Sequence, residues 1–184
     1  MGKNADAHAL AEKQAKVETR WTYDGKYLKV RQDIIHIPKH PPKVWDIGIT
    51  PGAVAIIPLD AQKRIILVEQ WRRAIGQITL ELPAGMLDPD EAPIDCAQRE
   101  LQEETGYRAG LLEPFGGCYT SPGLFSEYIH LFLATDLTES RLYGDDTHTI
   151  DVKTVSLKEA FSMIEKGTIC DAKTIVGILR YANP

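Results

Sequence analysis

The chain has little cysteine, no long apolar run and no excess of basic charge. Its three cysteines, Cys96, Cys118 and Cys170, form neither a CxxC pair nor a cluster with histidine. This scatter argues against a disulfide framework and a zinc site, and favours ordinary buried cysteines. No apolar run is long enough to span a membrane, and the N-terminal residues lack the apolar core of a signal peptide. We therefore expect a cytoplasmic protein with no membrane partner.

The charge balance bears on the kind of partner. The formal net charge is −5, from 21 basic and 26 acidic residues. Proteins that coat nucleic acid usually carry a basic patch, so nucleic acid is not expected as a partner. A small phosphorylated substrate remains compatible with this charge, because a bound metal ion can supply positive charge. The length of 184 residues and the 43% hydrophobic content suit one ordinary domain with a small additional layer.

Composition divides the chain into three segments. Residues 1–16 are polar and rich in alanine and lysine, which suits at most a frayed helix. Residues 17–50 contain extended runs on both sides of Asp24-Gly25, a dipeptide typical of hairpins, and a further strand at 44–49. We expect this segment to form a small antiparallel β-subdomain. Residues 51–184 then form the main domain.

The main domain begins with strands. Residues 52–59 and 64–69 are apolar runs separated by a short polar turn, and we expect them to pair in a central sheet. Residues 115–134 return to extended structure around a turn at Ser121-Pro122-Gly123. Helices are expected before and after this extended stretch, so the sequence predicts an α/β sandwich.

The first helix of the main domain is expected after residue 87. Asp90 is the predicted cap, Pro93 suits the first turn, and Gly106 fits just past the end. Its predicted buried stripe consists of Ile94, Ala97 and Leu101.

Two later helices carry their own start signals. Ser156-Leu157-Lys158-Glu159 is a capping box, and the helix that it opens should stop at Gly167. Asp171 is the predicted cap of the last helix. The predicted buried stripe of that helix consists of Ile175, Ile178 and Leu179.

Three carboxylates gather at the end of the first of these helices, in the run Arg99-Glu100-Leu101-Gln102-Glu103-Glu104. Glu100 and Glu104 would lie one turn apart on one face, with Glu103 beside them. Like charges at this spacing repel, and the negative end of the helix dipole adds to the penalty. A hard divalent cation would reverse both effects, and oxygen-only ligands suit Mg²⁺ or Mn²⁺ rather than zinc. Taken alone, however, the run favours a solvated acidic face on which Arg99 pairs with Glu103.

The surrounding residues change that interpretation. The stretch Gly85-x5-Glu91-x7-Arg99-Glu100-Leu101-x-Glu103-Glu104-x-Gly106-Tyr107 resembles the Nudix box at every fixed position. The resemblance covers residues 20–182. Glu69-Gln70-Trp71-Arg72, Glu81-Leu82-Pro83-Ala84-Gly85 and Ser121-Pro122-Gly123 with Glu127 are similar to the ADP-ribose pyrophosphatase branch. Asp171-Ala172-Lys173 resembles the Asp-x-Lys motif of the related nucleoside diphosphate sugar hydrolases.

This resemblance implies a fold and an activity. The fold would be a Nudix α/β/α sandwich with a mixed central sheet, preceded by the small β-subdomain. The activity would be Mg²⁺-dependent hydrolysis of the pyrophosphate bond of nucleoside diphosphate sugars, including ADP-ribose, with Mn²⁺ as a possible substitute. An ADP-ribose-specific pyrophosphatase and a non-catalytic nucleotide-binding module are the alternatives. The module is disfavoured because every box glutamate is present. Pro122 and the Asp-x-Lys motif argue against a mononucleotide triphosphatase or a coenzyme A hydrolase.

The resemblance also implies roles for the box residues. The metal ligands would be Glu100, Glu104, the backbone carbonyl of Ala84, and Glu103 either directly or through water. Arg99 would hold Glu103 in place. Gly85 would let the backbone turn sharply so that the carbonyl faces the metal. Glu91 would be structural, tying the loop to the helix.

A second set of residues would contact the substrate. Its members would be Arg72, which resembles the phosphate-gripping arginine of the family, Glu81, Gly85, Glu127, Asp171 and Lys173. A forked guanidinium suits a diphosphate, whereas Arg73 is expected to be exposed. A lysine near a helix N-terminus is unfavourable to the helix and sensible if an anion must be met there. An ordinary helix cap with a surface lysine is the alternative for Asp171 and Lys173.

The sequence leaves the general base and the oligomer less defined. In the loop at 138–149, His148 aligns with the position at which relatives often carry a catalytic glutamate, so Glu139, Asp145, Asp146 and His148 all remain candidates for the base. The resemblance and the apolar surface of residues 17–50 imply a homodimer formed through this β-subdomain. Three of its aromatic residues would then contact the partner or the base, or else form an ordinary core; they are Trp21, Tyr23 and Trp45.

Overall fold

The computed structural model describes residues 3–144 and 149–183, which form two compact units. The first unit runs to Thr50 and also includes Ser121–Glu127; the second contains Pro51–Thr120 and the chain from Tyr128 onward. In chain order the first unit has α1 (Lys3–Gln14), β1 (Lys16–Asp24), β2 (Lys29–His36) and β3 (Lys43–Ile49). The second has β4 (Ala53–Pro58), β5 (Ile65–Arg72), β6 (Gln77–Glu81), β7 (Ala84–Met86), α2 (Pro93–Thr105), β8 (Tyr107–Tyr119), β9 (Tyr128–Glu139), β10 (Asp151–Val155), α3 (Leu157–Glu165) and α4 (Ala172–Ala182).

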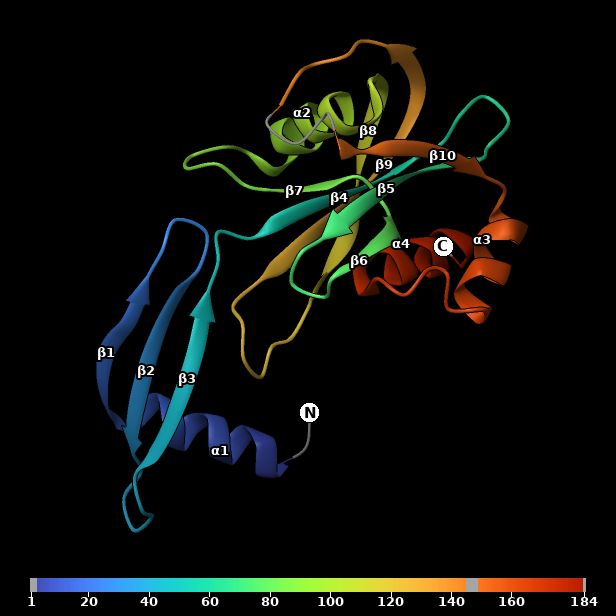
Figure 1. Cartoon of the computed structure of the whole chain (residues 1–184). Helices are drawn as coiled ribbons and strands as arrows, with labels where there is room; N and C mark the ends of the chain where they lie inside the picture. The colour runs from blue at the N-terminus through green and yellow to red at the C-terminus, as the bar shows by residue number, and fades with distance from the viewer. Residues whose placement is uncertain (1–2, 145–148, 184) are drawn as a thin grey trace. The chain divides into compact units, whose positions relative to one another are not determined.

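The first unit is built on an antiparallel sheet in the order β1-β2-β3 (Figure 1). The hairpin expected around Asp24-Gly25 is confirmed, since β1 and β2 pair from Lys16 with His36 to Asp24 with Lys29. A segment distant in sequence also joins this unit, because Phe125 bridges to Gly48 of β3. The sequence did not indicate this addition, which leaves the β-subdomain larger than a continuous segment.

The aromatic residues of the first unit are exposed. Trp21, Tyr23 and Trp45 have exposed fractions of 56%, 58% and 41%. Every residue of β1 is exposed. A core role for these three side chains within their own unit is therefore wrong, and they are exposed large side chains on the sheet of this unit.

The second unit contains two sheets, one mixed and one antiparallel. The mixed sheet has the order β7-β4-β9-β8, with β4 and β9 parallel, and the antiparallel sheet has the order β10-β5-β6. The expected pairing of β4 with β5 was wrong, because only one isolated bridge, Leu59 to Ile65, joins the two strands. Both strands are almost entirely buried, so their apolar runs gave no indication of which strand lies beside which.

Helix α2 covers one face of the mixed sheet. The other face packs against the antiparallel sheet and helices α3 and α4 (Figure 1). On one face of β4, Val54 and Ile56 pack against α2 through Ala97 and Leu101. On its other face, Ile57 packs with the second sheet and with helices α3 and α4. The expected α/β sandwich with a mixed sheet is confirmed. It places α2 directly over the strand that pairs with β7.

The helix ends follow most of the expected signals. Gly106 ends α2 in the left-handed region, with φ of 80°. The capping box of Ser156 and Glu159 is present, and Asp171 caps α4 by accepting from the N–H of Thr174. Asp90 does not cap α2: the cap position is Ala92, and Asp90 lies two residues upstream with φ of 63°.

Several buried positions differ from the expectation. Ile94 and Leu179 are 44% and 42% exposed, whereas Ala97, Leu101 and Ile178 are fully buried. Of the three cysteines, Cys96 is buried, Cys118 is half-buried and Cys170 is exposed. The buried apolar faces of α2 and α4 are therefore narrower than the spacing of their apolar residues predicted. Among residues 3–144 and 149–183, no helix has the length and apolar character needed to cross a membrane.

Candidate active site

The site begins where the short strand β7 meets helix α2. The backbone N–H of Ala84 donates to Glu104 Oε2 at 2.9 Å. Gly85 lies in extended strand, so the expected sharp turn at this residue was wrong. Glycine leaves room for the carboxylate of Glu100, which would have to move away from a Cβ at position 85. The carboxylates of Glu104 and Glu100 thus lie close to the backbone of residues 84 and 85.

Burial sets the charge state of these two carboxylates. Glu104 is 8% exposed, and burial raises its pKa to about 8 against the hydrogen bond from Ala84. Burial also raises the pKa of Glu100, and the neighbouring charge of Glu103 adds to the rise. Desolvation and like charges both disfavour ionisation, and a nearby cation would favour it. For both groups, burial outweighs the neighbouring positive charges, which are Arg99 for Glu100 and Arg72 and Lys173 for Glu104.

Arg99 bridges helix α2 to the loop before it. Its Nε and Nη2 each donate to Glu91 at 2.9 Å, and these bonds hold the pKa of Glu91 at about 2. Its Nη1 donates to Glu100 at 2.6 Å and lies 3.4 Å from Glu103. Glu91 also accepts from the N–H of Asp88 at 3.1 Å. The main partners of Arg99 are thus Glu91 and Glu100, with Glu103 the more distant one.

A second cluster centres on Glu81, at the end of β6. Arg72 donates from Nε to Oε1 at 2.8 Å and from Nη2 to Oε2 at 2.7 Å. The ammonium of Lys173 also contacts Glu81 Oε2, and Thr79 donates to Oε1 at 2.5 Å. Burial alone would raise the pKa of Glu81, but the bonds and charges of Arg72 and Lys173 hold it at about 2. One buried carboxylate therefore organises two cations.

The N-terminus of α4 supplies the rest of this cluster. Asp171 Oδ2 accepts from Lys173 Nζ at 3.0 Å and from the N–H and hydroxyl of Thr174 at 3.0 and 2.6 Å. The hydroxyl of Thr174 also accepts from the N–H of Leu82 at 2.8 Å. Asp171 thus caps the helix and binds Lys173 at once. The side chain of Lys173 is only 11% exposed, so this lysine is not an ordinary surface residue.

The two clusters form one site. The positive charges of Arg72 and Lys173 both act on the pKa of Glu104, in the direction that favours its ionised form. The chain also links the clusters directly, because Glu81, which binds both cations, precedes Ala84, whose N–H binds Glu104, in the segment Glu81-Leu82-Pro83-Ala84. The site therefore combines two cations with buried carboxylates whose pKa values remain raised.

The donors suit a hard divalent cation. Glu100, Glu103 and Glu104 offer only oxygen, and the first and last are buried with raised pKa values. Within the part of the chain that the structure describes, no three acidic, histidine or cysteine side chains converge as a finished metal site. Instead, the carboxylate of Glu100 accepts a hydrogen bond from Arg99. A metal ion would therefore have to compete with Arg99 for that carboxylate.

Of the remaining predicted residues, Glu127 and Glu139 take part in none of the hydrogen bonds described for these clusters. Glu127 belongs to the first unit and is half-buried, whereas Arg73 is exposed as expected. Glu139 is exposed at the end of β9. The other candidates for the general base, Asp145, Asp146 and His148, lie outside the described residues.

Two threonines were missed by the sequence reasoning. The hydroxyl of Thr79 donates to Glu81. The hydroxyl of Thr174 donates to Asp171 and accepts from the N–H of Leu82, the residue after β6. The alternation of a strand places residues 79 and 81 on one face, so this signal was present. Thr174 lies three residues after a capping aspartate, which is the position that a cap contacts.

Comparison with known proteins identifies the family. Residues 49–176 match the NUDIX domain family. The chain is 35% identical over 158 residues to ADP-ribose pyrophosphatase of Bacillus subtilis, with 85% of each chain covered. It is 34% identical over 164 residues to methanol dehydrogenase activator of Bacillus methanolicus, covering 88% of this chain and 89% of the relative. It is 35% identical over 147 residues to GDP-mannose pyrophosphatase of Cronobacter sakazakii, covering 75% of each.

A solved structure supports the fold. The crystal structure of an ADP compounds hydrolase superposes with a TM-score of 0.83 at 20% identity, covering 91% of this chain and 92% of that one. At this identity the likeness bears on the fold alone. The match of residues 49–176 and the 35% identity to ADP-ribose pyrophosphatase of Bacillus subtilis show that the chain belongs to the NUDIX domain family.

Proposed function

We propose that this protein hydrolyses the pyrophosphate bond of nucleoside diphosphate sugars, including ADP-ribose, to a nucleoside monophosphate and a sugar phosphate. The observation that carries the proposal is the placement of Arg72 and Lys173 on one buried carboxylate beside Glu104. A diphosphate needs both cationic side chains and metal-binding carboxylates. Relatives named ADP-ribose pyrophosphatase and GDP-mannose pyrophosphatase, each 35% identical, support the same substrate class.

Enzymes of this family generally depend on a divalent metal ion. We assign Mg²⁺ here, with Mn²⁺ as a substitute, because the donors of the box are all oxygen. Glu100, Glu103 and Glu104 would hold it with the carbonyl of Ala84. When bound, it supplies charge neutralisation at the diphosphate and activation of water. Arg99 positions the carboxylates around it.

The chain's own residues would bind and orient the substrate. Arg72 presents a planar guanidinium, already aligned by two bonds to Glu81, to the diphosphate. Lys173, aligned by Glu81 and Asp171, would meet the sugar phosphate side. Gly85 keeps the backbone close to Glu100. Glu127, on the first unit, would contact the sugar side. We also propose a homodimer formed through the exposed β1 surface.

A substrate panel tests the proposal. Purified protein with Mg²⁺ is incubated with ADP-ribose, GDP-mannose, UDP-glucose, NADH and diadenosine polyphosphates, and the products are identified. Release of a nucleoside monophosphate and a sugar phosphate from several sugar nucleotides is the expected result. Cleavage of ADP-ribose alone would reduce the function to an ADP-ribose-specific pyrophosphatase. Tight binding without cleavage of any compound would identify a non-catalytic nucleotide-binding module and refute the proposal.

A further inference from the structure

The chain that leaves β9 lies along helix α2. We name residues 140–144 the strap. The N–H of Ser140 donates to the carbonyl of Gly106 at 2.8 Å, and the N–H of Leu142 approaches the carbonyl of Gln102 at 3.4 Å. The strap therefore starts at the C-terminal end of α2 and runs back along the helix that carries the box glutamates.

Gln102 joins the strap to the helix by its side chain. It is 7% exposed, and its Nε2 donates to both the backbone carbonyl and the hydroxyl of Ser140, each at 3.0 Å. Gln102 lies beside Glu103 and two residues from Glu104 and Glu100, yet bonds to none of them in the described contacts. A buried amide with two bonds to a distant segment acts as a fixed connection.

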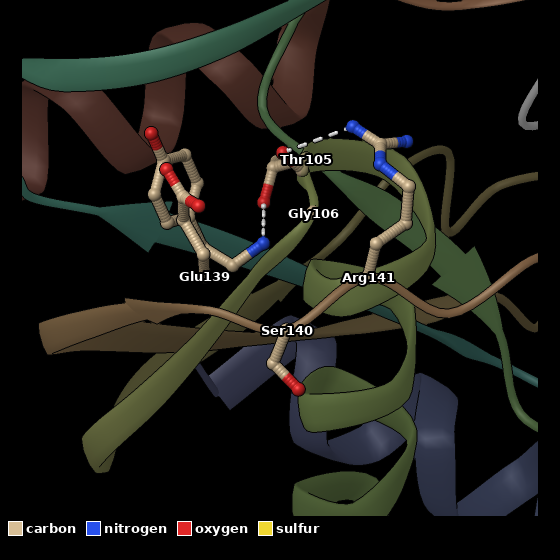
Figure 2. A pocket seen from close by; sticks show the side chains of 6 residues that line it. Thr105, Gly106, Glu139, Ser140 and Arg141 are labelled. Atoms are coloured by element: carbon tan, nitrogen blue, oxygen red, sulfur yellow. Dashed lines mark hydrogen bonds between the residues drawn. The ribbon is translucent and has the colours of Figure 1, made fainter.

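The side chain of Arg141 links the beginning of the strap to the C-terminal end of α2. The guanidinium of Arg141 reaches the carbonyl of Thr105 at 3.5 Å, as Figure 2 shows. A positive charge is favoured at the C-terminal end of a helix, where carbonyl groups lack partners. A Cβ at position 106 would lie 2.8 Å from Arg141 Nη2, so Gly106 leaves room for this contact. The pocket at this end is lined by Thr105, Gly106, Tyr107, Glu139, Ser140 and Arg141.

The far end of the strap meets a box carboxylate. A Cβ at Gly144 would lie 2.7 Å from Glu103 Oε2 and 3.0 Å from Glu103 Cδ. The backbone of Gly144 thus forms one wall beside the Glu103 carboxylate. Any shift of the strap along α2 would change the space available to that carboxylate.

We propose that Gln102 is a positioning residue, which fixes the strap on α2 and thereby holds the Glu103 carboxylate in the orientation that metal binding requires. This inference rests on the proposed function. Gln102 itself touches neither substrate nor metal and acts through Ser140 and Gly144. Its loss should leave substrate binding nearly intact and weaken the response to the metal.

Three variants separate the connection from general stability. Gln102→Ala removes both bonds to Ser140. Gln102→Glu keeps the shape but loses the N–H donor and faces the Ser140 carbonyl with a carboxylate. Ser140→Ala removes only the hydroxyl contact. The control is Gln98→Ala on the same helix: the Gln98 amide, with its nitrogen towards the Ala109 carbonyl, makes bonds of 3.2 and 3.3 Å to Ala109 and none to the strap.

Two measurements need no turnover. Hydrogen exchange of peptides covering 140–144 should accelerate in Gln102→Ala and Gln102→Glu but not in Gln98→Ala. The dissociation constant for Mn²⁺, measured by electron paramagnetic resonance, should rise about three- to tenfold in the two Gln102 variants. That rise is smaller than the roughly ten- to hundredfold loss typical of residues that bond directly to a metal ligand, because Gln102 acts on Glu103 only through Ser140 and Gly144. Ser140→Ala should show the same changes to a smaller extent.

Kinetics supply the third measurement. With a cleaved sugar nucleotide, the Mg²⁺ concentration for half-maximal rate should rise by the same factor in the Gln102 variants, with KM at saturating Mg²⁺ within about twofold of wild type. Faster exchange of the strap with unchanged Mn²⁺ affinity would overturn the inference, as would unchanged exchange in Gln102→Ala. If Gln102→Ala does not fold, Ser140→Ala and Gln102→Glu decide. If wild type cleaves no sugar nucleotide, the proposed function fails, while exchange and Mn²⁺ affinity still decide this inference.

Discussion

Arg72 of β5 lies opposite Gln77 and Glu81 of β6 lies opposite Val68, yet the side chains of Arg72 and Glu81 are joined by two hydrogen bonds, of 2.8 and 2.7 Å. The carboxylate that aligns Arg72 also binds Lys173, which lies 92 residues further along the chain. The side chain of Glu81 is 3% exposed, so solvent screens these interactions little. The orientation of both cations therefore depends on one buried residue.

Replacing Glu81 should disturb both cations together. We expect Glu81→Gln to lower kcat/KM for sugar nucleotides roughly ten- to a hundredfold, because hydrogen bonds to charged groups contribute about 1.5–3 kcal/mol each. The control is Glu69→Gln on β5, whose pair with Lys153 at 3.5 Å is solvent-exposed and should matter little. Steady-state kinetics on ADP-ribose measures both. Equal, small effects of the two substitutions would contradict the role of Glu81.

The same carboxylate should make stability depend on pH. The pKa of Glu81 is about 2 in the folded protein, against an ordinary value of 4.5. Between these values the unfolded chain binds more protons, so stability falls as pH falls. The contribution of the ionised group, about 1–3 kcal/mol, should be complete above pH 4.5 and be lost as pH decreases towards 2. Urea unfolding at pH 7, 5, 4 and 3 should show the gap between wild type and Glu81→Gln narrowing. A gap that stays constant would count against this assignment.

Lys173 should discriminate between substrates. If it meets the sugar phosphate, Lys173→Ala should lower kcat/KM about tenfold or more, and more for hexose-linked substrates than for ADP-ribose. Lys166→Ala, at the exposed end of α3, should change neither beyond a factor of about two. The measurement is kcat/KM for GDP-mannose and ADP-ribose with each variant. Small and equal losses on both substrates would favour an ADP-ribose-specific enzyme.

Replacing Glu104 should lower the activity of the protein without lowering its stability. Glu104→Gln should reduce turnover by about two orders of magnitude or more, because a metal-binding carboxylate is lost. The metal-free melting temperature should hold or rise slightly, since burial already raises the pKa of this carboxyl to about 8 and an amide carries no charge. Turnover in saturating Mg²⁺ and calorimetry without metal test the two parts. Near-normal turnover would exclude Glu104 as a ligand.

The exposed surface of β1 should mediate self-association. We expect light scattering at micromolar concentration to give twice the chain mass of 20.5 kDa. Trp21→Glu should yield a monomer, because it places a charge on a surface that the partner would bury. Val152→Glu, at a residue 42% exposed in the second unit, is the control and should stay dimeric. A monomeric and fully active wild type would refute the dimer.

Local features were readable from the sequence because they depend on neighbours in the chain. The spacing of Glu100 and Glu104 places both on one helix face, and Gly106 and Asp171 end and begin helices through their own backbone geometry. The family resemblance drawn from the box is confirmed. The motifs that carry this resemblance are short, so each lies within a single helix, cap or turn.

Partners distant in sequence were decided by the tertiary structure. A buried strand such as β4 has apolar residues on both faces, so periodicity does not show that it pairs with β9 rather than β5. Arg72 and Lys173 were each expected to bind substrate, but their shared attachment to Glu81 required β6 and α4 to pack together. Side-chain partners of this kind follow from which surfaces bury each other, and that choice minimises the free energy of the whole fold rather than of any one segment.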